Sequence, residues 1–402
     1  MLDTLLMVLN VLLLIGTLLL ALPVALLLAQ VLLAMATPRR LDDQPRPARI
    51  AALIPAHNEG HGVRATIMQA LSQLGDNDRL LVVADNCSDD TAAQARLLGA
   101  EVVERFDAER RGKGYALDHG VRHLEAAALV DGRTPDVVIV LDADCVLAPG
   151  LIPRLASLAH AHGRPVQASY LMHAAGPGLK ARVAEFAMRV KNLVRSRGMF
   201  RLGLPCQLLG TGMAFPWAVA LRAPLASGHL AEDMQLGVRL ARDGTPPMFC
   251  EDMLVTSVFA ASQEGERSQR TRWEHGHLSL LVGEGPRLLW QALRRGRVAQ
   301  AMLVLDMLVP PLALLAGLLV VALTVQLIWA LISGWVAGLV IAALAVLALI
   351  TAIIAARQRF ASDLIGLAEL MKAPLYILAK LPIYLSFVVR RQTEWVRTKR
   401  DH

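Results

Sequence analysis

Two carboxylates lie two residues apart in Asp142-Ala143-Asp144, directly after a short apolar run at residues 137–141. Carboxylate oxygens are ligands that Mg²⁺ and Mn²⁺ prefer, and an ion held there can neutralise a bound diphosphate. The same pattern also occurs in ordinary acidic turns at strand ends. The pair therefore needs supporting signals elsewhere in the chain.

Further polar residues follow other short apolar runs. Glu59 comes after the run at 50–54, and Asp85 comes after the run at 80–84, where it can contact a base or a ribose. Asp85 begins an acidic stretch that is equally typical of helix capping. Lys113, between two glycines, can reach a phosphate from a flexible loop, although a solvated loop position explains it nearly as well.

The later part of the polar region carries two more signals. Asp233 follows Glu232 at the start of a helical pattern, where an acid can take a proton from a hydroxyl or compensate the helix dipole. Gln269, Arg272 and Trp273 lie in the stretch Gln-Arg-Thr-Arg-Trp. The arginine can bind a diphosphate bidentately and the indole offers a flat face to a sugar; an amphipathic helix on lipid headgroups is the other interpretation.

A soluble α/β unit between about residues 49 and 285 must position these side chains. Short apolar runs predict strands that are buried on both faces: 50–54, 80–84, 101–103 and 137–141. The stretches between them predict helices: 63–74, 90–98 and 114–127. Such alternation predicts a mainly parallel sheet, and ligands of such sheets bind beyond the carboxyl ends of the strands. We therefore expect the polar motifs to meet at that edge.

Both ends of the chain are far more apolar than its middle. Hydrophobic residues make up 55% of the 402 and charged residues 19%, too few charges for a fully soluble protein. Residues 1–36 exceed the roughly 20 residues that cross a bilayer. The run is too long for a signal peptide and lacks a basic start, so an uncleaved transmembrane anchor is predicted rather than a cleaved leader.

The second apolar region, residues 301–356, predicts a transmembrane hairpin. It should turn at Ser333-Gly334, and Pro310-Pro311 should kink its first arm. Asp306 lies near the cytoplasmic end of that arm. We expect it to be a solvated acid near a helix start, with a functional role as the alternative.

Basic residues flank the apolar runs, in linkers at residues 37–48 and 286–300. By the positive-inside rule these ends and the middle of the chain face the cytoplasm, as expected for a multi-pass protein of the inner (plasma) membrane. Within the last segment, 357–402, the apolar stretch 374–389 is short and has basic residues on both sides. An interfacial helix followed by a basic cytoplasmic tail fits it better than a full crossing.

The composition also argues against some functions. Lysine and arginine outnumber aspartate and glutamate, 41 to 34, but aromatic residues are only 4%, so binding of nucleic acid is not predicted. Residues 178–201 alternate basic and apolar side chains at helical spacing, as in an interfacial helix near a polyprenyl diphosphate or a solvated helix packed on the domain. The four cysteines form no C-x-x-C pair, which favours reduced thiols over a zinc site or a disulfide.

The order of the motifs resembles that of membrane-bound family-2 glycosyltransferases, closest to the branch of cellulose, chitin, hyaluronan and poly-N-acetylglucosamine synthases. The residues that carry the resemblance are Pro55 to Glu59, Asp85, Gly112-Lys113-Gly114, Asp142-x-Asp144, Glu232-Asp233 and Gln269-x-x-Arg272-Trp273. The resemblance covers roughly residues 49–285. It implies a GT-A fold, a Rossmann-like α/β domain flanked here by transmembrane helices, and transfer with inversion from a UDP- or GDP-sugar that uses Mg²⁺ or Mn²⁺.

The resemblance also implies roles on the donor side. Glu59 and Asp85 would contact the nucleotide, and Lys113 would lie near its phosphates. Asp142 and Asp144 would hold the donor and the metal, with Asp144 the more direct metal ligand.

On the acceptor side, the resemblance makes Asp233 the general base. Gln269, Arg272 and Trp273 would close over the diphosphate and the acceptor, which is a glycan or a polyprenyl-linked intermediate beside the lipid bilayer. Such enzymes contribute to bacterial exopolysaccharide or cell-envelope synthesis, in some cases together with polysaccharide export machinery.

The chain departs from the synthase pattern in three respects. Ala231 stands where the synthases commonly have threonine, the first acidic motif is Asp-Asn rather than Asp-Asp, and about three spans are too few for the channel of the large cellulose synthases. Processive synthesis and single-sugar transfer to a lipid-linked intermediate both stay open. The alternative function is a catalytically silent membrane scaffold that binds a nucleotide within a polysaccharide assembly complex.

Overall fold

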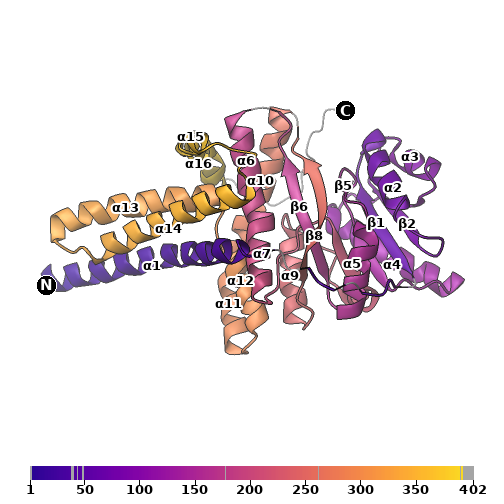
Figure 1. Ribbon diagram of the computed structural model, residues 1–402, viewed down its shortest axis with the longest axis horizontal. Coiled ribbons are helices and arrows are strands. Elements are labelled where there is room, and N and C mark those ends of the chain that lie inside the picture. Colours follow the sequence, from indigo (N-terminus) through magenta and orange to yellow (C-terminus); the bar gives the residue numbers. More distant parts are fainter. Residues whose placement is uncertain are drawn as a thin grey trace.

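The structure is a computed structural model of the chain. It describes residues 2–37, 40–42, 44–47, 49–176, 178–260, 262–389 and 391–392. The molecule is elongated, with a bundle of long helices at one end and an α/β unit at the other (Figure 1). The basic C-terminal tail beyond residue 392 lies outside the described residues, as does Arg39 in the first linker.

Within the described residues, eight strands form one sheet in the order β3-β2-β1-β4-β7-β6-β8-β5. The strands are β1 (Ile50–Ala56), β2 (Arg79–Asp85), β3 (Glu101–Arg105), β4 (Val137–Val140), β5 (Val146–Leu147), β6 (Val166–His173), β7 (Met213–Pro216) and β8 (Met248–Val258). The strands β1 to β4 run parallel to one another, whereas β7 is antiparallel to both of its neighbours, β4 and β6. The prediction of a mainly parallel α/β sheet with the GT-A arrangement is confirmed.

Alternate residues of β1 enter two different cores, as the two-residue period of a strand requires. Ile50 and Ile54 pack with the helices on one face, and Leu53 packs with those on the other. The helices around the sheet are η1 (Gly60–Gly62), α2 (Val63–Leu71), α3 (Thr91–Leu97), α4 (Lys113–Asp131), α5 (Leu151–His162) and α8 (Trp217–Arg222). Because both faces are covered, the strands read as continuous apolar runs.

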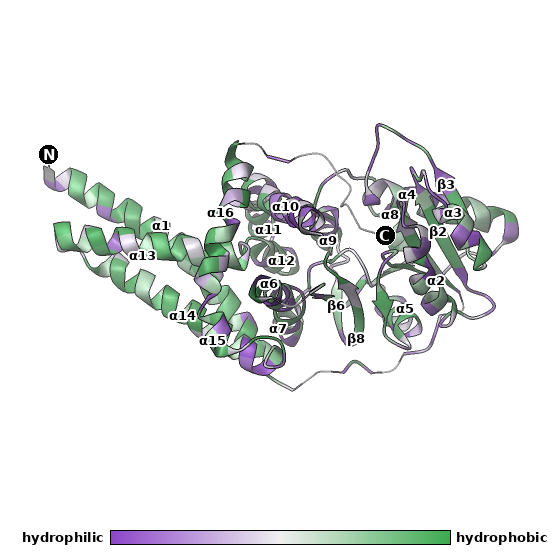
Figure 2. Ribbon diagram, turned by 90° about the horizontal axis from the view of Figure 1, so that it is seen from above, coloured by the Kyte–Doolittle hydropathy of each residue, from purple (hydrophilic) through white to green (hydrophobic). Residues whose placement is uncertain are grey.

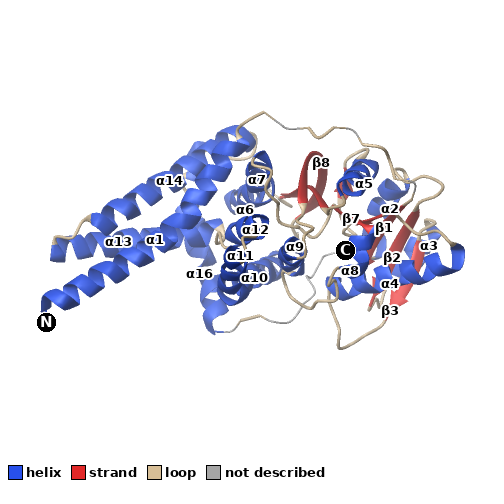
Figure 3. Ribbon diagram, turned by 90° about the horizontal axis from the view of Figure 1, so that it is seen from below, coloured by secondary structure: helices blue, strands red, loops and turns tan. Residues whose placement is uncertain are grey.

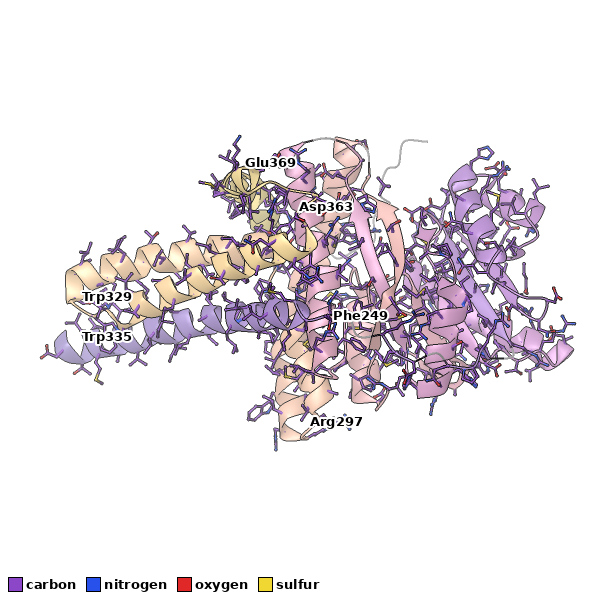
Figure 4. All side chains as sticks on the ribbon, in the orientation of Figure 1. Phe249, Arg297, Trp329, Trp335, Asp363 and Glu369 are labelled. Atoms are coloured by element: carbon purple, nitrogen blue, oxygen red, sulfur yellow. The ribbon has the colours of Figure 1, made fainter. Side chains whose placement is uncertain are left out.

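Among the described residues, three helices are long and apolar enough to cross a membrane: α1 (Leu2–Ala34), α13 (Leu312–Ser333) and α14 (Ala337–Phe360). They form the apolar bundle of Figure 2. Trp329 and Trp335 lie at the end of the bundle away from the sheet, while Asp363 and Glu369 lie at the near end (Figure 4). Tryptophan is enriched at the boundary between a bilayer and water, which fits the position of these two residues.

The apolar run that starts at residue 301 is divided between two helices. Pro310-Pro311 does more than kink it: α12 (Val298–Met307) ends before the prolines and α13 begins after them. Proline lacks the N–H that continues a helix, which explains the break. The helix α12 packs on α9 (Glu232–Arg242) and α11 (Gly285–Arg294), so it belongs to the α/β unit.

The prediction that Asp306 is solvated was wrong. It is only 4% exposed and lies near the end of α12 rather than at a helix start. One carboxylate oxygen accepts hydrogen bonds from Gln30 Nε2 at 2.6 Å and Arg195 Nη2 at 2.9 Å, and the other accepts from Gln207 Nε2 at 3.1 Å. None of these three partners belongs to α12. The acid is therefore paired inside the protein with residues from other parts of the chain.

A helical layer separates the sheet from the membrane bundle (Figure 3). Besides α9, α11 and α12 it contains α6 (Leu179–Arg189), the π-helical turn η2 (Val190–Val194), α7 (Arg195–Arg201), α10 (Gln263–Ser279) and the π-helical turn η3 (Leu280–Glu284). The basic stretch expected at 178–201 is therefore helical, but Arg195 and Arg197 on it are buried rather than solvated. The short α15 (Leu367–Leu370) and α16 (Ala373–Val389) lie across the end of the bundle (Figure 1).

Candidate active site

The first polar motifs lie at the carboxyl edge of the sheet, where β1 and β2 end. Asp85 is the last residue of β2 and is 5% exposed. Its carboxylate accepts a hydrogen bond from Arg105 Nη1 at 2.6 Å. Arg105, the last residue of β3, was missed in the sequence; its place two residues after the predicted strand 101–103 was the available signal.

The turns after β1 and β2 are held in an uncommon backbone conformation. Asn58 has φ of 52° and Asn86 has φ of 51°, both in the left-handed region. The Asn58 side chain accepts a hydrogen bond from the Ser88 N–H at 2.6 Å, and the Glu59 N–H donates to Thr91 Oγ1 at 2.9 Å. Such strained turns persist where the surroundings fix them, often at functional sites. Glu59 and Asp85 are thereby carried on two turns that are bonded to each other.

Lys113, the first residue of α4, connects the third motif with a glycine loop. Its ammonium group forms an ion pair with Asp142 and donates a hydrogen bond to the Gly210 carbonyl oxygen at 2.8 Å. The Asp142 N–H donates to Thr211 Oγ1 at 2.9 Å, so the same loop also fixes the backbone of the Asp142-x-Asp144 motif. This arrangement gathers a cation and two carboxylates at the end of β4.

Asp233 lies beside this ion pair, at the start of α9. A Cβ atom placed on Gly210 would be 3.5 Å from both Lys113 Nζ and Asp233 Oδ2, so the glycine separates the two side chains. Gly210 also has φ of +91°, which L-residues with side chains rarely adopt. The loop therefore needs glycine for its backbone, and the cation and the carboxylate both lie beside it.

The neighbouring acids are held away from bulk water. Burial and the charge of Asp233 raise the pKa of Glu232 to about 7. Burial also raises the pKa of Asp233, although Lys191 and Lys113 oppose that shift. Burial would lower the pKa of Lys113, but the nearby carboxylates outweigh it and raise that pKa. An acid with a raised pKa next to a cation suits proton abstraction near neutral pH.

The described residues hold no group of three or more His, Cys, Asp or Glu side chains that could bind a metal by itself. The Asp142-x-Asp144 pair nevertheless fits an ion such as Mg²⁺, which usually takes one or two carboxylates and completes its shell with substrate phosphates and water. Lys113 fits the same arrangement because it can bind phosphate oxygens beside the ion. The donor set is thus suited to an ion that arrives with a diphosphate.

The last motif lies on α10, between the acids and an apolar cavity. The positive charge of Arg272 acts on Glu232 and lowers its pKa, opposing the larger effect of burial. Trp273 packs against Phe259, with ring centroids 6.3 Å apart, and lines the cavity. Gln269 is buried, and its side chain accepts the Ala260 N–H at 3.5 Å.

The structure therefore divides the sequence motifs into groups. Lys113, Asp142, Glu232 and Asp233 form one cluster, which Arg272 approaches from α10. The turns that carry Glu59 and Asp85 form a second group, and Gln269 and Trp273 face the packing of α10 and the cavity. Lys191 was missed, because nothing in its sequence separates it from the other cations of residues 178–201.

Comparison with known proteins gives one family match. The profile of the family described as "Glycosyltransferase like family 2" matches residues 46–276, more than half of the chain. No curated protein sequence matches this chain.

Several solved structures are distantly similar. The mannosyltransferase PcManGT from Pyrobaculum calidifontis, in complex with GDP-Man and Mn²⁺, is 19% identical with a TM-score of 0.47, and the alignment covers 82% of this chain and 99% of that one. Glucosyl-3-phosphoglycerate synthase from Mycobacterium tuberculosis is 19% identical with a TM-score of 0.35, over 60% of this chain and 86% of that one. GalNAc-T7 is 12% identical with a TM-score of 0.41, over 65% and 54% of the two chains.

Proposed function

The chain belongs to glycosyltransferase-like family 2, and we propose that it is an inverting, metal-dependent enzyme of the cytoplasmic membrane face. It would move a sugar from a UDP- or GDP-sugar to the hydroxyl group of a glycan or a lipid-linked acceptor. Its place would be bacterial exopolysaccharide or cell-envelope synthesis, with or without export machinery as a partner.

One observation supports this proposal above the others. Lys113 is paired with Asp142 and separated from Asp233 only by Gly210. A phosphate-binding cation, a metal-binding carboxylate and a candidate base are thus adjacent. In glycosyl transfer the leaving diphosphate and the attacking hydroxyl must both lie close to one anomeric carbon.

In the proposed reaction Asp233 takes the proton of the acceptor hydroxyl. The hydroxyl oxygen then forms a bond to the anomeric carbon as the bond from that carbon to the diphosphate oxygen breaks, which inverts the configuration. Lys113 and Arg272 stabilise the negative charge that develops on the diphosphate. A Mg²⁺ or Mn²⁺ ion held by Asp144 and Asp142 would supply further charge neutralisation there.

The remaining motif residues would bind rather than react. Glu59 and Asp85, on their linked turns, are proposed to contact the nucleotide. Trp273 would offer its ring to the acceptor, and Gln269 would fix the position of α10 beside it.

The proposed location is the inner (plasma) membrane, with α1, α13 and α14 as spans and the α/β unit in the cytoplasm. The apolar helices and the basic residues at their near ends support it. The test inserts a protease site in the loop at residues 334–336 or at residues 131–134. We expect the first site to be cleaved by protease added outside the cell, and the second only after lysis. The opposite pattern would contradict this orientation.

The experiment uses the full chain in lipid nanodiscs with a panel of nucleotide sugars and Mn²⁺. Nucleotide release and donor binding are measured for the wild type, Asp144→Asn, Asp233→Asn and the distant surface control Asp131→Asn. Both site variants should lose about 10²-fold or more of turnover, which is the scale of a lost base or a lost charged ligand. Asp233→Asn should keep metal-dependent donor binding, whereas Asp144→Asn should lose it.

Full turnover in both site variants would overturn the mechanism. Metal-dependent donor binding by the wild type without turnover, over a broad set of acceptors, would instead favour the silent scaffold.

A further inference from the structure

A cavity of about 160 Å³ lies where the membrane bundle meets the helical layer. Most of its wall is apolar and comes from α1, α6, α10, α13, α14 and α16. Leu312 and Ala316 on α13 and Ile353 on α14 belong to helices that are able to cross a membrane. The cavity is therefore bounded on one side by segments whose outer surface would contact lipid chains.

The charged groups in this apolar wall are almost all paired. Three of the lining cations have a carboxylate partner: Arg195 with Asp306, Arg270 with Glu266 and Lys380 with Glu274. Lys191 also lines the cavity, but among the described residues it has neither an ion pair nor a hydrogen bond to its ammonium group. A half-buried ammonium without a partner is costly, so an anion in the cavity would be favoured there.

Lys191 also connects the cavity with the candidate base. It lies in the π-helical turn η2, and such interruptions of a helix occur frequently at functional sites. Among charged groups it has the largest effect on the pKa of Asp233, ahead of Lys113. From the membrane inward, the order is an apolar cavity, an unpaired cation and a carboxylate that can accept a proton.

We propose that the acceptor is a single-chain lipid phosphate that carries a sugar or alcohol hydroxyl. Its chain enters the cavity beside α13 and α16, its phosphate binds Lys191, and its hydroxyl reaches Asp233. This inference rests on the proposed function, because it takes Asp233 as the base and adds the chemical class of the acceptor.

The cavity supports one chain rather than two. Its volume is close to the roughly 150 Å³ of an engineered apolar cavity that holds a single benzene molecule. It therefore has room for the head end of one hydrocarbon chain, while the rest of the chain lies in the bilayer. A free glycan fits poorly, because an apolar wall leaves the hydroxyl groups of a sugar without hydrogen-bond partners.

The first test is binding, which does not depend on the donor. The full chain in nanodiscs is titrated with a synthetic prenyl diphosphate monosaccharide, and the bound probe is counted by native mass spectrometry. Wild type should bind it saturably, and Lys191→Met should weaken binding about tenfold or more, the scale of one charge-assisted hydrogen bond. Lys191→Arg should restore most of the affinity.

Two further variants separate the cavity from the membrane surface in general. Ala316→Phe fills the cavity and should abolish probe binding, whereas Val320→Phe on the exposed part of α13 should not. Lys372→Met removes an exposed lysine outside the cavity lining and should also bind normally. Retained donor binding in each variant shows that the α/β unit is folded.

The second test compares acceptors with a donor that the enzyme turns over. The prenyl diphosphate monosaccharide should be glycosylated, and phosphatidylglycerol, which has two chains, and a soluble oligosaccharide should not. The inference would be overturned if phosphatidylglycerol or the oligosaccharide were glycosylated at the same rate as the prenyl diphosphate monosaccharide. It would also be overturned if Lys191→Met and Ala316→Phe bound the probe as wild type does. Probe binding without donor binding would contradict the proposed function instead.

Discussion

Lys113 holds Asp142 in an ion pair while its ammonium group also donates to the Gly210 carbonyl oxygen at 2.8 Å. A metal-bound diphosphate that arrives at Asp142 would compete for the same carboxylate. Lys113 is then free to exchange its carboxylate partner for a phosphate oxygen, without leaving the loop that fixes it. Under the proposed function, the ion pair would thus place a cation for the donor phosphates before the donor binds.

Lys113→Met should therefore act on the donor. Loss of one charge-assisted hydrogen bond corresponds to roughly 1.5–3 kcal/mol, so the donor KM should rise about ten- to a hundredfold. Steady-state kinetics with varied donor measure it. Lys180→Met, which removes a lysine whose side chain is 63% exposed, should leave the KM unchanged. An unaltered donor KM in Lys113→Met would argue that this lysine only supports the loop.

Glu232→Gln should stabilise the protein in mildly alkaline solution. Because the folded pKa is raised to about 7, the folded state retains a proton that the unfolded state has already released at lower pH. Between the unfolded and folded pKa values the free energy of unfolding falls as pH rises, and the loss is complete above about pH 7. Glutamine does not ionise, so the melting temperature of the variant should exceed that of wild type at pH 8 and match it near pH 4.

The control for this measurement is Glu109→Gln, a change at an exposed position. Its melting temperature should follow that of wild type at both pH values. Glu232→Gln could also change the melting temperature by the same amount at pH 4 and pH 8. That result would show that the ionisation of Glu232 does not cause the change.

Local patterns were sufficient to predict the strands β1 to β4, the motifs at their ends and the long apolar helices, whereas β5 to β8 were not predicted. The strand β1 and the run before Asp142 are buried on both faces, as is typical of strands in a covered parallel sheet. Contacts between segments that are distant in the sequence could not be predicted from these patterns. Asp306 looked solvated because its partners, Gln30 and Arg195, lie far away in the chain. Lys191 differs from the neighbouring cations in having no ion-pair partner among the described residues, and a sequence pattern does not show which residues are partners.

Asp306→Ala should cost several kcal/mol of stability. Removing one member of a buried ion pair leaves the other charge without compensation, at roughly 3–5 kcal/mol. Here the Arg195 guanidinium and the side-chain amides of Gln30 and Gln207 would lose their hydrogen-bond acceptor. Thermal unfolding in nanodiscs measures the effect. Asp363→Asn is the matched control, since Asp363 pairs with Arg189 at 3.2 Å but is 72% exposed and should change stability by less than about 0.5 kcal/mol.

Gly198→Ala should detach the first membrane helix from the α/β unit. The helix α7 crosses the end of α1 so closely that a Cβ on Gly198 would lie 2.7 Å from Gln30 Cα, and backbone atoms cannot yield as a side chain can. Overpacking of this kind costs roughly 1–3 kcal/mol or more. Displacement of Gln30 would also remove its hydrogen bond to Asp306, so the loss should spread to α12.

The measurement is the melting temperature together with turnover, and Gly16→Ala on the same membrane helix is the control, since a Cβ there meets nothing within 4 Å. Gly198→Ala should lower both quantities and Gly16→Ala neither. The contrary outcome is that Asp306→Ala lowers the melting temperature but Gly198→Ala does not. In that case α7 and α1 would separate without disturbing the hydrogen bond between Gln30 and Asp306. The close crossing would then contribute little to the position of the membrane helix.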